Sequence, residues 1–410
     1  MTNPKPAVHG TPSDPYRIFF PLGVLMGIAG VSIWPLFHWG WTAGYSGRAH
    51  AFVQTNCFLY AFIAGFLWTA IPRFTGTSAP GRAVQFTLAA ILVAELVAFE
   101  SYWFTAGHVL FVVAHGTLLS VIVRCFIRRQ HPPPETFMFV GLGLMAGAIA
   151  AVINAASGLA WISAGWDSLG KRLLTEGMVL LLVLGVGGFL GPRLMGFAQL
   201  PNLQSLEKLS ERRSVPLATK LRGRINAVFG ILLLASVFVE YGWKHPFTAL
   251  LPWIRAVAVT AVIAMNVQPW RAPVTQTTLA WCVWIAHWFL IGGVWLIALF
   301  PNHHIDYLHI LFMGAFTLLI LAVGTRVVLS HGGYPLTEER RSWPLRIAIA
   351  ASLIGMSARL SVMASPTESF YFTHLAWAGL LWILGMSLWG LYLTRRIRRS
   401  TPPESGGQRD

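Results

Sequence analysis

Long apolar segments alternate with short polar loops along the whole chain. Cutting the sequence at charged or proline-rich loops leaves twelve segments, each long enough to cross a bilayer core of about 30 Å as a helix. Their approximate ranges are 17–38, 50–71, 84–104, 107–127, 137–160, 173–192, 225–243, 248–266, 277–299, 308–329, 345–364 and 371–394. This pattern predicts an all-α, polytopic membrane protein with about twelve transmembrane helices.

The longest interruption is the Arg- and Lys-rich stretch 193–224, which separates two halves of six helices. We interpret it as a basic cytoplasmic loop, so that residues 1–410 form a single integral membrane domain. Composition agrees, because 55% of the residues are hydrophobic and 11% are charged, whereas soluble domains carry about 25% charged residues. Cys57, Cys125 and Cys282 are widely spaced in or beside apolar segments, so no disulfide framework is expected.

The net charge of +15 reflects orientation in the membrane. Lys and Arg gather in the N-terminal tail, in alternate loops and in the C-terminal tail, and few lie on the opposite side. Because basic loops stay in the cytoplasm, both termini are predicted to be cytoplasmic. The N-terminal tail has no apolar core or cleavage site of a signal peptide, so we expect the first helix to stay as an anchor. No nucleic-acid motif is present, and lipid is the expected surrounding.

A weak internal repeat links three of the segments. They end in GFLWTAIPRFTG, GGFLGPRLMG and LAVGTRVVLSHGG. The similarity predicts a four-helix unit used three times, with Arg73, Arg193 and Arg326 at equivalent cytoplasmic ends. In that register Glu176 is equivalent to His309, and His50 lies at the same end of the second segment. The alternative is chance similarity among apolar helices.

Most of the 13 histidines fall in outer loops, at outer helix ends or near the midplane. Only His9, His131 and His331 lie on the cytoplasmic side. Ionisable groups are costly inside a bilayer, so several at one depth indicate a function. Imidazole ligates haem iron or copper, and we therefore expect any metal site in the outer half.

His50 and His309 open the second and tenth segments at the same predicted depth. Two histidines on different helices at one depth are what axial ligation of a b-type haem requires. The chain has no C-x-x-C-H motif, so such a haem would be held noncovalently. The structural alternative is that each imidazole merely bonds a carbonyl at the interface.

Other histidines are candidates for copper or for a second haem. His108 and His115 share one face of the fourth segment, and His287 lies near the middle of the ninth. For each of them a buried neutral imidazole bonded to a helix carbonyl is the alternative. The secondary metal and cofactor candidates are His108, His115, His287 and His374.

The remaining polar groups are interpreted more simply. His303, His304 and Asp306 form a polar outer loop, for which we favour a solvated loop over a metal site. Glu95 and Glu100 are either proton-relay groups or partners of arginines. The three arginines at the inner helix ends are expected to reach phosphate headgroups.

Three stretches carry a resemblance to the NnrS family of bacterial inner-membrane proteins. They are PYRIFFPLGV from Pro15 to Val24, the second-segment block that ends GFLWTAIPRFTG, and LHILFMGAFTLLILAVGTRVVLSHGG in the tenth segment. The resemblance spans the whole chain. The commoner family form opens the second helix with His-Glu-Met, whereas here His50 is followed by Ala51 and Phe52, so an acidic neighbour is missing.

The resemblance implies a membrane protein that contains haem b, with copper as a second candidate metal. It also implies a part in the response to nitric oxide, in denitrification and in nitrosative stress. Whether the gas would be reduced by a haem-dependent oxidoreductase, sequestered or sensed stays open, as does the electron donor. The layout is similar to the catalytic subunit of haem-copper oxidases, but the mid-membrane histidine pairs of those enzymes are missing, so oxygen reduction is not expected.

Two other classes of function fit the same segments. A transporter exporting a small solute or a metal complex suits twelve helices divided by a basic loop, and a membrane scaffold for a partner complex is the second. Neither has a reason to copurify with haem. The presence of haem therefore separates the leading hypothesis from both.

Overall fold

The structure is a computed structural model that describes residues 14–198, 217–242 and 246–399. Twelve of its helical segments are long and apolar enough to cross a membrane, and the described residues contain no strand. The predicted all-α, polytopic fold is confirmed. Of the predicted loop 193–224, residues 199–216 lie outside the described residues, and the seventh membrane helix begins at Leu217 instead of 225.

The chain consists of three successive four-helix units, and their bounds are as follows. The first unit contains α1 (Tyr16–His38), α2 (Gly47–Phe52), η1 (Val53–Leu59), α3 (Tyr60–Thr75), α4 (Arg82–Glu100) and α5 (Phe104–Ile127). The second contains α6 (Phe137–Gly158), η2 (Ala164–Trp166), α7 (Asp167–Arg172), η3 (Leu173–Val179), α8 (Leu180–Leu194), α10 (Leu217–Gly242), η4 (Pro246–Leu250) and α11 (Leu251–Asn266). The third contains α12 (Thr278–Leu299), η5 (Pro301–His303), α13 (His304–His309), η6 (Ile310–Phe316), α14 (Thr317–His331), α15 (Glu338–Arg341), α16 (Trp343–Ser361), η7 (Val362–Ala364) and α17 (Glu368–Arg399).

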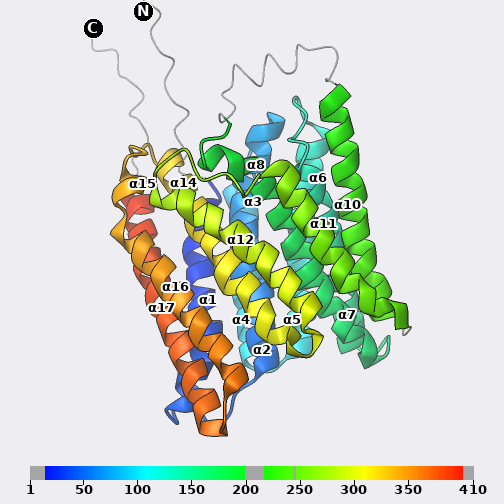
Figure 1. Cartoon of the computed structure of the whole chain (residues 1–410), viewed down its shortest axis with the longest axis vertical. Helices are drawn as coiled ribbons and strands as arrows, with labels where there is room; N and C mark the ends of the chain where they lie inside the picture. The colour runs from blue at the N-terminus through cyan, green and yellow to red at the C-terminus, as the bar shows by residue number, and fades with distance from the viewer. Residues whose placement is uncertain (1–13, 199–216, 243–245, 400–410) are drawn as a thin grey trace, which may run out of the picture.

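The three units close into a ring. Within each unit the first membrane helix packs on the second, and the third packs on the fourth. Between units, α5 packs on α6, α11 on α12, and α17 returns to α1. A hydrogen bond from Arg17 Nη1 to the Ile397 carbonyl (2.9 Å) joins the two ends of the chain. In Figure 1, α17 and α1 lie close together at one side of the bundle.

The second membrane helix of each unit lies at the centre of the ring. Each of these helices has a short α-helical start, a seven-residue π-helix and a longer α-helix, and η1 contacts η3. The longer segments α3, α8 and α14 line an apolar cavity of about 110 Å³, with Phe62, Val183 and Leu319 on its walls. π-Helical segments are rare in proteins, and those that occur often lie at functional sites. Their recurrence at the same place in all three units supports the repeat and indicates a functional centre.

The structure corrects the register of the repeat. Each central helix is followed by a glycine in the left-handed region, at Gly76, Gly196 and Gly333. Counted from these glycines and from the π-helices, Arg73 and Arg193 are equivalent to Ser330, so the predicted equivalence with Arg326 is wrong by one helical turn. Glu176 is accordingly equivalent to Asn56 and not to His309. Aligning the three arginines gives the wrong register, because the left-handed glycine turn, and not the arginine, determines where each central helix ends.

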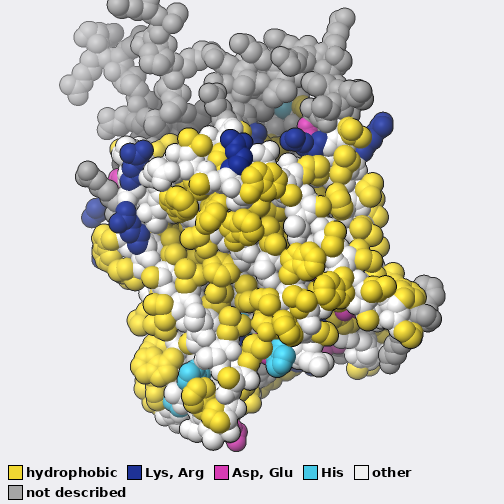
Figure 2. Space-filling view, viewed as in Figure 1, with side chains coloured by type: hydrophobic (Ala, Val, Ile, Leu, Met, Phe, Trp, Pro, Cys, Tyr) yellow, Lys and Arg dark blue, Asp and Glu magenta, His cyan; other side chains and the backbone are white. Residues whose placement is uncertain are grey.

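The two ends of the bundle differ in charge. The end where α1 begins and α17 ends, which we call the basic end, carries most of the Lys and Arg side chains visible in Figure 2. Histidine side chains appear at the other end in the same view. We call that other end, where α2 and α13 begin, the histidine end.

Candidate haem site

His50 is held by the neighbouring helix α1. Ser46 caps the start of helix α2, and its side chain accepts a hydrogen bond from the backbone N–H of Ala49. One residue on, His50 Nδ1 lies 2.7 Å from the carbonyl oxygen of Gly30. A carbonyl only accepts, so Nδ1 carries the proton and Nε2 keeps a lone pair. This is the tautomer of a metal-ligating histidine whose other nitrogen bonds a carbonyl.

Gly30 makes this contact sterically feasible. A Cβ atom at that position would lie 2.5 Å from Val53 Cγ1 and 2.7 Å from Gln54 Nε2. Only a residue without a side chain therefore allows α1 to approach the start of the second membrane helix so closely. The glycine is a positioning residue for His50 that the sequence did not single out.

His309 has the same tautomer. It is the last residue of α13, immediately before the π-helix η6, and its Nδ1 donates to the carbonyl oxygen of Ile305 one turn earlier at 2.7 Å. Its Nε2 makes no hydrogen bond to any described residue. The two predicted axial ligands therefore present the same free nitrogen.

The structure brings His50 and His309 together. They lie close enough for their charges to interact, and both interact with Arg359 on α16. Arg359 is largely buried, and its Nη1 forms an ion pair with Asp306 Oδ1 at 2.9 Å. Two imidazoles beside a fixed cation have the chemistry to hold an anionic, metal-containing group, because imidazole can ligate the metal and the cation can pair with carboxylates of that group.

A buried ionic network lies beside this site. Glu176, in η3, binds Arg172, lies 2.9 Å from His304 Nε2, and lies 3.4 Å from Arg255 Nη2. Arg255 also pairs with Glu240 Oε2 at 2.5 Å. The network joins α7, η3, α10, α11 and α13. His304 is thus part of a protein network, and the predicted solvated loop holds only for His303, which pairs with Asp306 at 3.3 Å.

A comparison with known protein families shows which family the chain belongs to. The sequence model of the NnrS protein family matches residues 12–400 of the 410-residue chain. The chain belongs to the NnrS family. The resemblance seen in three sequence blocks is thereby confirmed over nearly the full length of this NnrS protein. A search of curated proteins found no matching relative.

The histidines of α5 in this NnrS protein have different surroundings. His115 uses both ring nitrogens, with Nε2 2.9 Å from the Leu144 carbonyl and Nδ1 3.1 Å from the Tyr60 hydroxyl. His108 is buried between the rings of Phe52 and Phe99, and neither of its nitrogens has a partner among the described residues. Of the two, only His108 offers a free lone pair for a metal.

His287 and His374 lie on other elements. His287 is buried in α12 and donates from Nδ1 to the Val283 carbonyl at 2.7 Å. His374 Nδ1 is 2.5 Å from the Ser361 hydroxyl, and its ring stacks on Phe370 at 3.9 Å. Over the residues described, no three His, Cys, Asp or Glu side chains lie together as a metal-binding group. Copper at these histidines stays a prediction.

Arginines at the basic end bond to protein groups. Arg73 pairs with Asp14 at 3.1 Å and lies 3.1 Å from His331 Nε2, and Arg326 pairs with Glu339 at 2.6 Å. Burial raises the pKa of the Glu339 carboxyl, and the Arg326 guanidinium opposes that shift. Both arginines therefore have acidic partners within the protein, and their predicted contact with phosphate headgroups stays a prediction.

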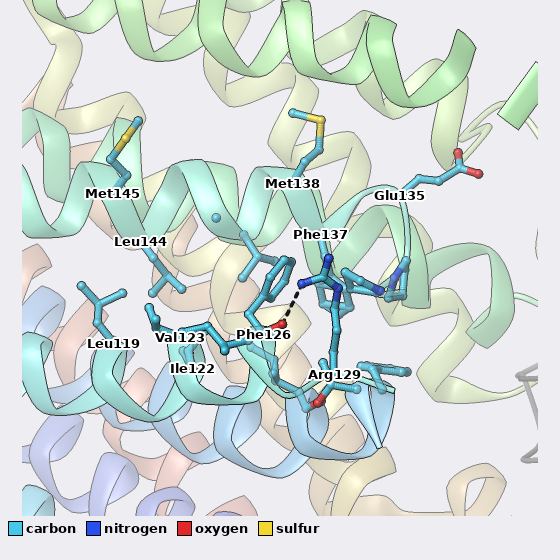
Figure 3. Close-up of a pocket in the computed structure, with 18 of the residues that line it drawn as sticks. Leu119, Ile122, Val123, Phe126, Arg129, Glu135, Phe137, Met138, Leu144 and Met145 are labelled. Carbon is cyan, nitrogen blue, oxygen red and sulfur yellow. Dashed lines mark hydrogen bonds between the residues drawn. The ribbon is translucent and has the colours of Figure 1, made fainter. Parts of the chain in front are cut away.

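A larger hollow lies away from the histidines. It has a volume of about 800 Å³ and is lined by apolar side chains of α3, α5 and α6, among them Phe137, Leu144 and Met145. Figure 3 shows these side chains together with Arg129, which donates to the Phe126 carbonyl at 2.7 Å. None of the predicted site residues lines it.

Proposed function

We propose that this NnrS protein binds a b-type haem through His50 and His309 and takes part in the response to nitric oxide. The observation that carries the proposal is the matched pair of imidazoles. Each has Nδ1 bonded to a backbone carbonyl and Nε2 free, they come from two different central helices, and they lie within electrostatic reach of each other. A bis-histidine haem needs this chemistry from its protein ligands.

Different residues of the chain would orient the two imidazoles and pair with the haem propionates. The carbonyls of Gly30 and Ile305 fix the orientation and the proton position of the two rings. Arg359, held by Asp306, would pair with a propionate. Bound haem would supply an iron centre with affinity for nitric oxide. The family's name supports the link to nitric oxide, and reduction, sequestration and sensing are all compatible with this site.

We also propose that the protein lies in the bacterial inner membrane with its basic end in the cytoplasm. The Lys and Arg side chains gather where α1 begins and α17 ends (Figure 2), and basic residues are retained on the cytoplasmic side. His50 and His309 would then face the periplasmic half of the membrane.

The experiment that tests the haem proposal is spectroscopy of the purified protein. Protein from haem-replete cells is purified in mild detergent, and absorption spectra are recorded oxidised, dithionite-reduced and reduced with nitric oxide. Haem and copper are quantified on the same sample. We expect a b-type spectrum that changes on adding nitric oxide, in the wild type and in a His303→Ala control. Colourless wild-type protein would refute the proposal and favour the transporter or scaffold.

A further inference from the structure

Glu95 is a buried carboxyl without a partner. It lies in the membrane helix α4, its exposed fraction is 0%, and neither carboxyl oxygen makes a hydrogen bond to any described residue. By contrast, Glu176, Asp306 and Glu339 are all ion-paired. A carboxylate without an ionic partner is costly in such a place, and this cost favours the neutral, protonated form of Glu95.

A second unpartnered group faces this carboxyl. The side-chain amide of Asn56, in η1, is the polar group directed at Glu95. Asn56 is also fully buried, and its Nδ2 has no acceptor among the residues described. Its Oδ1 accepts a hydrogen bond from Thr55 at 2.8 Å. Glu95 and Asn56 therefore interact, but no hydrogen bond of normal geometry to a described residue satisfies the Glu95 oxygens or Asn56 Nδ2.

The polar surroundings continue into the bundle. The Tyr60 side chain lies within electrostatic reach of Glu95, and its hydroxyl is 3.1 Å from His115 Nδ1. Because His115 Nε2 must donate to the Leu144 carbonyl, Nδ1 is the acceptor and the Tyr60 O–H donates. The Tyr60 oxygen therefore keeps its capacity to accept a further hydrogen bond.

A second carboxyl connects the site to the histidine end. Glu100 ends α4, and five residues of helix place it about 7.5 Å further toward that end. Cys57 interacts electrostatically with both Glu95 and Glu100. The titratable side chains on the elements packed against α4 are Tyr16, Arg17 and His38 on α1, Arg48 and His50 on α2, Cys57 on η1 with Tyr60 next in the same membrane helix, and His108, His115, Arg124 and Cys125 on α5.

We propose that Glu95 is a proton-binding site inside the membrane, which exchanges its proton through Glu100 with water at the histidine end. Uptake forms the O–H bond of the carboxylic acid from a proton of that water, and release returns it. Nothing is oxidised or reduced, and no haem is needed for the exchange. The proposal thus stands apart from the haem proposal above.

The test is infrared spectroscopy of the purified protein, with and without haem, first in H2O and then after transfer to D2O. A neutral carboxylic acid has a C=O stretch separate from that of a carboxylate, and the band shifts when its proton is replaced by deuterium. We expect this band in the wild type, its loss in Glu95→Gln, and its deuterium shift in the wild type. In the matched variant Glu100→Gln the band should persist and its shift should be slower.

Three results would contradict the proposal. Absence of the band in the wild type means that Glu95 is ionised. A band that never shifts in D2O means a sealed acid without exchange, and an unchanged rate in Glu100→Gln removes the proposed route. If Glu95→Gln does not fold, Glu95→Asp assigns the band by moving it while keeping an acid. A shifting band in colourless protein would support this site even where the haem proposal has failed.

Discussion

The ionic network around Glu176 makes a prediction about stability. Glu176→Gln keeps the size of the side chain but removes the negative charge that lies between Arg172 and Arg255. Arg255 is 4% exposed and Glu176 is 5% exposed, so water cannot replace the lost partner. Removing one member of a buried ion pair costs about 3–5 kcal/mol. Part of this cost is offset here because Glu240 still pairs with Arg255.

The assay is reversible unfolding of the detergent-solubilised protein, followed by circular dichroism. Asp167→Asn is the matched control, since Asp167 pairs with Lys171 at 2.7 Å and with Arg48 at 3.5 Å, but both cations are at least 40% exposed. Such exposed pairs contribute about 0–1 kcal/mol. A double variant, Arg172→Met with Glu176→Gln, restores charge balance and should recover part of the loss. An equal effect of Glu176→Gln and Asp167→Asn on the free energy of unfolding would refute the reasoning.

Two further predictions concern the residues that position the candidate ligands. Gly30→Ala places a Cβ 2.5 Å from Val53 Cγ1 and should displace the carbonyl that holds His50. We therefore expect less haem per protein. Gly44→Ala is the control, because its Cβ would meet no atom within 4 Å, and it should leave the haem content unchanged. Arg359→Gln removes a cation beside both imidazoles. The cation disfavours ferric haem, which carries one more positive charge than ferrous haem, so its loss should lower the haem midpoint potential in a redox titration. A potential that is unchanged or raised would show that Arg359 does not act on the haem.

The fold could be predicted from the sequence because its signal is local. An apolar run of sufficient length specifies a membrane helix by itself, and all twelve segments were found in this way. The π-helices η1, η3 and η6 were not predicted, since one extra residue per turn leaves no mark in hydropathy. They depend on how the three central helices pack on one another, and the hydropathy pattern of one segment carries no information on that packing.

The candidate site was predictable only in part. His50 and His309 could be singled out because two histidines at one membrane depth carry a free-energy cost that a function would explain. Their partners did not: Gly30 contributes only a carbonyl, and His304 meets Glu176 across 128 residues of sequence. Arg359 could have been singled out from the sequence, because it lies near the histidine end whereas most Lys and Arg residues lie at the basic end.

Ligation of one haem by both His50 and His309 can be tested by chemical rescue with imidazole. In His309→Gly the ring is removed and a space of imidazole size is left. The ferric protein should lose its low-spin bis-histidine spectrum and regain it when imidazole is added, while His303→Gly stays as the wild type. A low-spin spectrum in His309→Gly without imidazole, at full haem content, would contradict the claim and assign the second ligand to another residue.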